Sequence, residues 1–191
     1  SRDVALVVGV DKPGPWGSSA AMAGIPSLAD DAIAPFTHFA MLADRYTQRW
    51  HLDFADVARV AVKNHRNASL NPHAQHQKVR TLEEILGGRA IAGGFTSLQC
   101  TPVGEGAAAA VVASEAAIRA LGVSPDKPVR VLASAGRSER LYDDGPSIDA
   151  QLTAETTGIA LCEAGVGIEQ VDVIELHDAF TIEELEYLEA M

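Results

Sequence analysis

The chain has 191 residues, of which 47% are hydrophobic and 21% charged, as in an ordinary globular protein with one sizeable core or two small ones. Its formal net charge of -11, from 26 acidic and 15 basic residues, argues against nucleic acid as the main partner, although a local basic patch could still bind a small anion. Two cysteines without a short spacing favour a reducing, cytoplasmic setting, and no apolar run reaches the roughly 18–20 residues that would span a bilayer.

The first elements are a strand and a helix separated by a long loop. The Val-rich run 4–10 predicts a central buried strand, and the segment 11–26, with its prolines and glycines, predicts a loop. Apolar residues at helical spacing predict a helix within 27–50, and Pro35 would delay or kink it.

Two further helices are predicted from their N-terminal signals. Asp53 is a suitable N-cap for a helix over 53–65, and the polar stretch 64–78 then predicts a loop. Thr81 and Glu84 form a capping-box pattern at the start of a short helix that ends near a pair of glycines.

The alanine-rich segment 106–121 is ambiguous. Its alanine content favours one long helix. The alternative is a strand of small residues up to Ala113, followed by a helix that Ser114 caps.

The last part of the chain alternates between the two kinds of element. Strands are predicted at 129–134 and 171–176, and a glycine-terminated helix at 153–167 lies between them. A second capping box, from Thr181 to Glu184, starts the final helix. This alternation predicts an α/β fold with a mixed or parallel sheet.

His177 and Asp178 stand at the end of the predicted strand 171–176, just before a helix. Polar residues at this edge of an α/β sheet point into the usual ligand crevice, and free N–H groups of the helix would favour an anion or oxyanion there. The alternative is a surface His-Asp pair in a turn, and the residues alone leave both interpretations open.

Other candidate groups have weaker support. His73 and His76 are three residues apart, but Pro72 argues against a helix there and no further ligand completes a metal site. Cys100 would need an activating partner to act as a nucleophile, so a packed turn is the better interpretation, and Cys162 in an alanine-rich helix is expected in the core.

Four stretches, taken together, resemble the thiolase superfamily, specifically its sterol-carrier-protein-2-type and archaeal-type members. They are "DVALVVGVDK", "VAVKNHRNASLNPHAQ", "SLQCTPVGEGAAAAVVASEAA" and "ELHDAFTIEE", and they occur in the family's order. The third has Glu105-Gly106 where the family usually has Asp-Gly, and the fourth is a variant of the family's Asn-Glu-Ala-Phe motif.

The resemblance implies a layered αβαβα thiolase-like fold with an inserted helical loop domain. Residues 1–25 would end the N-terminal half, 26–80 would form the loop domain that covers coenzyme A, 81–122 would return to the N-terminal half, and 123–191 would begin the C-terminal half. It also favours the strand-then-helix interpretation of 106–121.

The resemblance also implies roles for individual residues. His177 would stabilise the thioester oxygen, directly or through a water. The acyl and pantetheine tunnel would be lined by Ala179, Phe180, Cys100, Thr101 and Pro102, with Tyr142 as a neighbour. The loop domain offers five basic residues for the phosphates of coenzyme A: Lys63, His65, Arg66, His73 and Lys78.

The implied activity is that of an acyltransferase that acts on acyl-CoA or 3-ketoacyl-CoA through an acyl-cysteine. Coenzyme A would be substrate or product, no cofactor would be covalently bound, and no metal is expected. The family's nucleophile precedes "DVALVVGV" and its later catalytic His and Cys follow "HDAF", so neither Cys100 nor Cys162 matches a catalytic position. We therefore expect a middle segment that lacks both ends of the enzyme and is inactive alone.

Two other functions are compatible with the resemblance. One is a non-catalytic protein or subunit that binds acyl-CoA or lipid, and the other is a side-chain aldolase of the lipid-transfer type. The aldolase relatives tend to have Tyr at the position of His177, which favours thiolase-like chemistry. Apolar surface on strand 4–10, Leu185 and Leu188 predicts association, as a homo-oligomer (a dimer or tetramer in the intact family) or with a second subunit.

Overall fold

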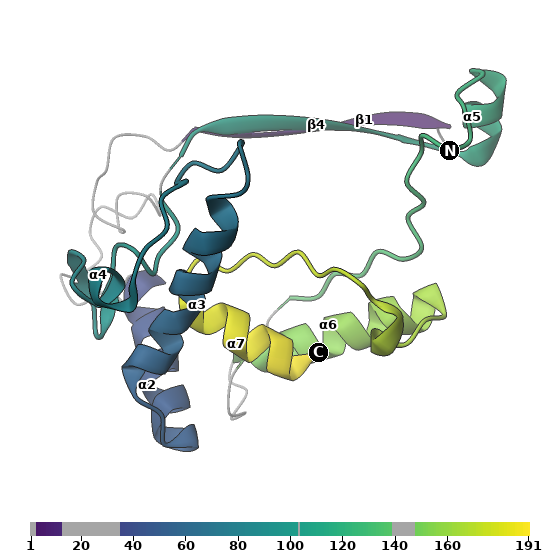
Figure 1. Ribbon diagram of the computed structural model, residues 1–191. Coiled ribbons are helices and arrows are strands. Elements are labelled where there is room, and N and C mark those ends of the chain that lie inside the picture. The colour runs from purple at the N-terminus through teal and green to yellow at the C-terminus, as the bar shows by residue number, and fades with distance from the viewer. Residues whose placement is uncertain (1–2, 13–34, 103, 139–147) are drawn as a thin grey trace, which may run out of the picture.

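The computed structural model describes residues 3–12, 35–102, 104–138 and 148–191. Helices and strands are both present (Figure 1), and no helix within these ranges is long and apolar enough to cross a membrane. In chain order the elements are β1 (Val4–Asp11), α2 (Pro35–Trp50), α3 (Phe54–Ala68), α4 (Leu82–Leu86), β2 (Ala90–Ala92), β3 (Phe95–Thr96), β4 (Gly106–Ala113), α5 (Glu115–Ala120), α6 (Ile148–Ala164), the 3-10 helix η1 (Ile168–Gln170) and α7 (Thr181–Ala190).

β1 and β4 form a long antiparallel ribbon. Their register runs from Val4 opposite Ala113 to Asp11 opposite Gly106, and the ribbon lies along one side of the molecule in Figure 1. The strand predicted at 4–10 is therefore confirmed, but its predicted burial is wrong, since every residue of β1 is exposed. Within the described part of the chain both strands of the ribbon are exposed, so the apolar side chains of β1 pack only against their neighbours in the ribbon.

The structure resolves the ambiguity of residues 106–121 as a strand followed by a helix. β4 obtains its hydrogen bonds from β1, and its β-branched Val111 and Val112 suit a strand. The hydroxyl of Ser114 then accepts a hydrogen bond from Ala117 N at 3.2 Å and caps α5. Pairing with a partner strand outweighs the helical preference of the alanines.

The strands predicted at 129–134 and 171–176 do not form. A strand needs a hydrogen-bonding neighbour, and none of the described residues pairs with either segment. The sheets that are described are both two-stranded and antiparallel, so the predicted parallel or mixed sheet is also absent from the described ranges. The apolar residues of both segments instead lie beside α6, where they help to line a hollow of about 450 Å³.

The main core joins α2, α3 and α7. Its centre is aromatic: the Phe180 ring stacks on Phe39 with centroids 4.5 Å apart, and Phe95 meets Phe180 edge-on at 5.2 Å. The buried members of this cluster are Leu42, Ala43, Tyr46, Val57, Phe95, Phe180 and Ile182. A segment more than 110 residues away in sequence, the start of α7, is thus built into the same core as α2 and α3.

The helix starts follow their capping residues closely. Asp53 caps α3 with a capping box, and Thr81 caps α4 in the same way, as predicted. α2 begins at Pro35, whose fixed φ suits the first turn of a helix. α3 continues to Ala68, however, so the part of the predicted 64–78 loop before that residue is helical instead.

The predicted capping box of α7 is shifted by one residue. Phe180 is the N-cap, and its N–H donates to Glu183 Oε2 at 2.8 Å, in place of a Thr181–Glu184 pair. Residue 180 is held in extended backbone by its pairing with residue 100, which makes Thr181 the first helical residue. The hydroxyl of Thr181 is buried and has no hydrogen-bond partner among the residues that the structure describes.

Candidate functional site

An antiparallel bridge joins the segment after β3 to the start of α7. Cys100 pairs with Phe180, Thr101 N donates to Ala179 O at 2.8 Å, and Thr181 N donates to Gln99 O at 3.2 Å. These bonds bring together residues that lie about 80 positions apart in sequence. The tunnel residues predicted from the resemblance are gathered here: Ala179, Phe180, Cys100, Thr101 and, next in the chain, Pro102. Tyr142 lies outside the described residues.

His177 is exposed immediately before this bridge. The backbone N–H groups that were expected to face a ligand are partly occupied, since those of Phe180 and Thr181 donate to Glu183 and Gln99. The first turn of α7 also holds two buried glutamates, Glu183 and Glu184. The anion site expected at this helix end therefore stays a prediction, and the exposed imidazole is the side chain there that is open to a ligand.

A polar network anchors the turn that follows His177 to α3. The Nδ2 atom of Asn64 lies 3.1 Å from Asp178 Oδ2 and 3.1 Å from Glu184 Oε2. Lys63, the neighbour of Asn64, forms an ion pair with the other carboxylate oxygen of Glu184. Burial, and to a lesser degree the charge of Glu184, raises the pKa of Asp178, although its hydrogen bonds and Lys63 oppose the shift.

Sequence reasoning missed this network. Asn64 and Lys63 lie in the "VAVKNHRNASLNPHAQ" motif, and Asp178 lies in "ELHDAFTIEE". The sequence therefore indicated only that two motifs of one family both contain polar residues. Nothing in the spacing of either motif indicates that the two meet.

Glu183 is buried beneath the turn. Its carboxylate accepts hydrogen bonds from Phe180 N and from Tyr187 Oη, each at 2.8 Å. Burial raises the pKa of Glu183, while these two bonds and the nearby imidazole of His177 act in the opposite direction. His177 therefore stands beside two carboxyl groups, Asp178 and Glu183, whose pKa values are both raised.

The two cysteines differ in burial, and Cys162 does not lie in the core as expected. Burial raises the pKa of Cys100 to about 11, and its Sγ donates to Thr96 O at 3.3 Å. At neutral pH the thiol is therefore protonated, which is the state of a packed and unreactive cysteine. Cys162, expected in the core, is exposed on α6, because the described residues leave that face of the helix uncovered.

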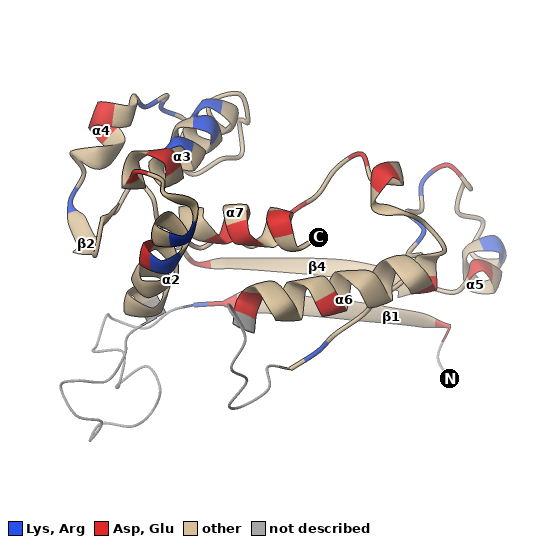
Figure 2. Ribbon diagram, turned by 90° about the horizontal axis from the view of Figure 1, so that it is seen from below, with Lys and Arg blue, Asp and Glu red and all other residues tan. Residues whose placement is uncertain are grey.

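The five basic residues proposed for coenzyme A do not converge on one point. Lys63 and Arg66 belong to α3, on which Figure 2 shows several basic residues. Together with Arg59 they line a hollow of about 430 Å³, which Val62 and Leu82 also line.

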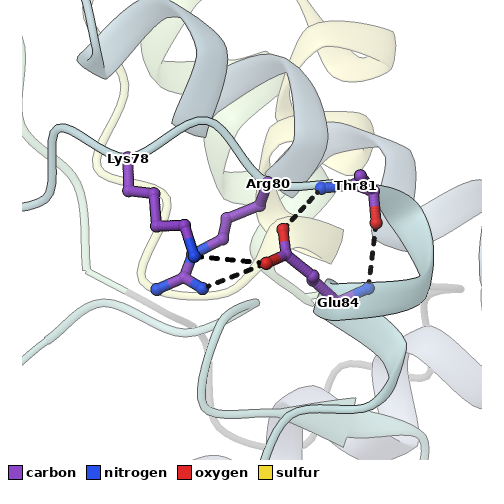
Figure 3. A network of polar contacts seen from close by, with 4 residues as sticks. All are labelled: Lys78, Arg80, Thr81 and Glu84. Carbon is purple, nitrogen blue, oxygen red and sulfur yellow. Dashed lines mark hydrogen bonds and ion pairs between the residues drawn. The ribbon is translucent and has the colours of Figure 1, made fainter.

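The other three basic residues lie elsewhere. His65 Nε2 lies 3.3 Å from Leu98 O, and His73 is exposed in the loop after α3. Lys78 is engaged with Glu84, which also accepts a bond from Thr81 N (Figure 3). The rings of His65 and His76 are 6.4 Å apart, but among the described residues no group of three His, Cys, Asp or Glu could hold a metal.

No protein-family model matches the chain, but individual proteins do. The benzoylsuccinyl-CoA thiolase subunit BbsB of Thauera aromatica is 38% identical over 154 residues, which cover 80% of this chain and 40% of that protein. Sterol carrier protein 2 of Bos taurus is 31% identical over 86% of this chain and 31% of its own length. The acetyl-CoA acetyltransferase of Methanothermobacter thermautotrophicus is 33% identical over 75% of this chain and 37% of its own length.

Solved structures agree in fold. A monomeric SCP2-thiolase like protein type 1 from Mycobacterium smegmatis has a TM-score of 0.74 at 20% identity, covering 98% of this chain and 41% of that one. The Ltp2-ChsH2(DUF35) aldolase has a TM-score of 0.75 at 24% identity, covering 98% of this chain and 51% of that one. The chain thus spans about a third to a half of the length of these relatives.

Proposed function

Sequence and fold match this chain to part of a thiolase-superfamily protein, and on that premise we propose that it supplies the acyl-CoA-contacting middle segment of a thiolase-like acyltransferase. The expected family is confirmed by relatives of the SCP2, thiolase and acetyl-CoA acetyltransferase kinds. The expected α/β thiolase-like fold is confirmed by the structural neighbours, over the part of their folds that this chain covers.

The bridge between Cys100 and Phe180 is the observation that supports this proposal most directly. It places the backbone of Thr101 against Ala179 and leaves the preceding His177 exposed. An acyl-pantetheine arm that runs along Thr101 and Pro102 would bring its thioester toward that imidazole. The two segments that the resemblance assigns to one tunnel therefore share one local surface.

The proposed chemistry is acyl transfer through a cysteine. A cysteine thiolate attacks the thioester carbon, the carbonyl oxygen gains negative charge, and the thiolate of coenzyme A then leaves. A ring N–H of His177, or a water that it holds, donates to that oxygen and stabilises the charge. The neutral thiol of Cys100 is a poor candidate for the attacking group, and neither Cys100 nor Cys162 stands at a catalytic position of the family, so we assign the nucleophile to a cysteine that is not in this chain.

The nucleotide end of coenzyme A is proposed to lie over α3, within the loop domain. Lys63 and Arg66 border the same hollow, so the exposed Arg66 could contact phosphate oxygens there, and Lys63 would do so by exchanging its ion pair with Glu184. His65, His73 and Lys78 remain candidates for the other phosphates. Lys78 would have to exchange its bond with Glu84 for one with the ligand.

A direct test combines binding with turnover on residues 1–191. We expect coenzyme A to bind in calorimetry, more weakly in 0.5 M salt because the contacts are charged, while thiolysis of acetoacetyl-CoA stays at the background rate. Thiolysis by this chain near the rate of an intact thiolase would contradict the assignment of the nucleophile. Absence of any coenzyme A binding at millimolar concentration would contradict the proposed role.

A side-chain aldolase that works with a second subunit is the other candidate. The similarity in fold to the Ltp2-ChsH2(DUF35) aldolase and the exposed apolar ribbon of β1 and β4 favour it. The His at position 177 argues against it. The discriminating assay uses the longer protein that contains these residues: retro-aldol cleavage of a hydroxyacyl-CoA without thiolysis would favour the aldolase.

A further inference from the structure

The side-chain amide of Asn64 contacts two carboxylates that come from a distant part of the chain. Its Nδ2 atom lies 3.1 Å from Asp178 Oδ2 and 3.1 Å from Glu184 Oε2. An amide nitrogen has two hydrogens, so each carboxylate can receive one. Asn64 therefore uses its full donor capacity on the turn before α7 and on the first turn of that helix.

Attachment of α3 to α7 does not depend on Asn64. Lys63 already forms an ion pair with Glu184, and the buried side chains of Val57 and Ile182 belong to the same core cluster. Besides a second contact with Glu184, Asn64 adds the bond to Asp178, and Asp178 is the residue next to His177. The contribution of Asn64 that no other described contact supplies is to hold Asp178 in the turn before α7, and not to join the two helices.

The ring of His177 has no hydrogen bond of its own within the described ranges. It is exposed, and the nearby charge that acts on it is that of Glu183. The described contacts nearest to it are those that hold the backbone on its C-terminal side. That backbone is fixed at Ala179 by the bond from Thr101 N and at Asp178 through Asn64.

We infer that Asn64 is a positioning residue, whose bond to Asp178 sets the direction in which His177 faces the acyl-CoA surface beside Thr101. The benefit of this role to catalysis rests on the proposed function, but the coupling of Asn64 to His177 can be measured without any ligand. A side chain on α3 would then control the geometry of a catalytic group on the segment before α7.

The first experiment observes His177 directly in residues 1–191. The ring signals of His177 are assigned in ¹H–¹³C NMR spectra by their loss in His177→Gln, and the exchange of the Thr101 and Thr181 amides is followed in parallel. Asn64→Leu removes both bonds at similar volume, and Asp178→Ala removes the acceptor from the other side. We expect both to shift the His177 signals and to speed exchange at the two amides about tenfold or more, with far-ultraviolet circular dichroism unchanged.

Three further variants separate positioning from general loosening. Asn64→Leu combined with Asp178→Ala should shift His177 no further than Asn64→Leu alone, because that change already removes the bond between Asn64 and Asp178. Asn64→Gln keeps the amide and should restore most of the native signals. Lys63→Met breaks the ion pair with Glu184 but leaves the bond to Asp178, so it should leave the His177 signals in place. Native His177 signals and native amide exchange in Asn64→Leu, or additive shifts in the double variant, would overturn the inference.

Ligand binding is measured last, with coenzyme A and acetoacetyl-CoA as probes. If the wild-type chain binds, Asn64→Leu should weaken the thioester more than coenzyme A, since His177 faces the acyl end. If the wild-type chain binds neither, the proposed function fails, and the positioning role is still decided by the NMR result alone.

Discussion

Cys100 and Phe180 face each other across an isolated antiparallel bridge, and the Phe180 side chain enters the aromatic core between Phe39 and Phe95. One residue thus closes the core with its ring and fixes the candidate site with its backbone. Stability and site geometry are therefore linked at this position.

Replacing Phe180 with Ala should destabilise the chain by about 3–5 kcal/mol, since a fully packed aromatic ring is lost and a cavity remains. Urea unfolding followed by circular dichroism measures the change. Phe36→Ala on the same helix as Phe39 is the matched control, because Phe36 is 42% exposed and should cost less than about 1 kcal/mol. Equal costs for the two variants would contradict the assignment of Phe180 to the core.

The two cysteines should react with iodoacetamide at very different rates. Cys162 is exposed, whereas Cys100 is half-buried, its pKa is raised to about 11 and its thiol donates to Thr96 O. At pH 7.5 we expect mass spectrometry to show one rapid adduct, on Cys162, and none on Cys100 over the same time. Cys162→Ala should remove the rapid adduct. Rapid modification of Cys100 would instead identify it as an activated thiol.

His177→Ala should leave the fold unchanged but impair chemistry. The side chain is exposed, so the free energy of unfolding should change by less than about 0.5 kcal/mol. In the longer protein that contains this chain, loss of one oxyanion donor should lower kcat about 10²–10³-fold. His177→Asn keeps an N–H donor and should recover part of the rate. Unchanged turnover in His177→Ala would refute the oxyanion role.

Glu84 should stabilise α4 only above acidic pH. The backbone N–H of Thr81 and the neighbouring Lys78 lower the pKa of Glu84, so the folded state holds its proton less tightly than the unfolded state. Its contribution is present above the unfolded value, near 4.3, and is lost as the pH falls through the lower folded value. Glu84→Gln should therefore weaken the chain at pH 7 in urea unfolding and match the wild type at about pH 2.5. A difference that persists at low pH would contradict this electrostatic origin.

Asp178 should show the opposite pH dependence. Burial raises its pKa above the usual carboxyl value near 3.9, so the folded state holds the proton more tightly than the unfolded state. Its ionisation then costs stability, and the cost grows as the pH rises from about 4 through the raised folded value. Unfolding of Asp178→Asn against the wild type from pH 4 to 7 should show the variant gaining relative stability with rising pH. Asp172→Asn, at an exposed position six residues before Asp178, is the control, and an identical profile for both variants would refute the shift.

Features that depend on a few neighbouring residues were predictable from the sequence. Asp53 and Thr81 cap their helices as their side chains indicate, because a cap bonds to backbone only two or three residues away. The box at α7 was misplaced by one residue because a distant segment intervenes: the bridge to Cys100 fixes residue 180 in extended backbone.

Predictions of strands and of burial failed where they required a second segment of the chain to pair with or cover the first. The apolar runs 129–134 and 171–176 have the composition of strands, but composition does not provide the neighbouring strand that a ladder requires. The burial of β1 and of Cys162 was overestimated likewise, since an apolar side chain is buried only if another element covers it.

The sequence by itself determined the helix caps at Asp53 and Thr81, because a cap depends on neighbouring residues, and its resemblance to a family singled out His177 as the candidate group. Only the tertiary structure decided that Thr101 meets Ala179 and that Asn64 meets Asp178, at sequence separations of 78 and 114. Such contacts follow from how the helices pack around Phe95 and Phe180, and packing depends on all the surfaces involved together. The residue that orients His177 is for that reason found on a helix that ends more than 100 positions before it.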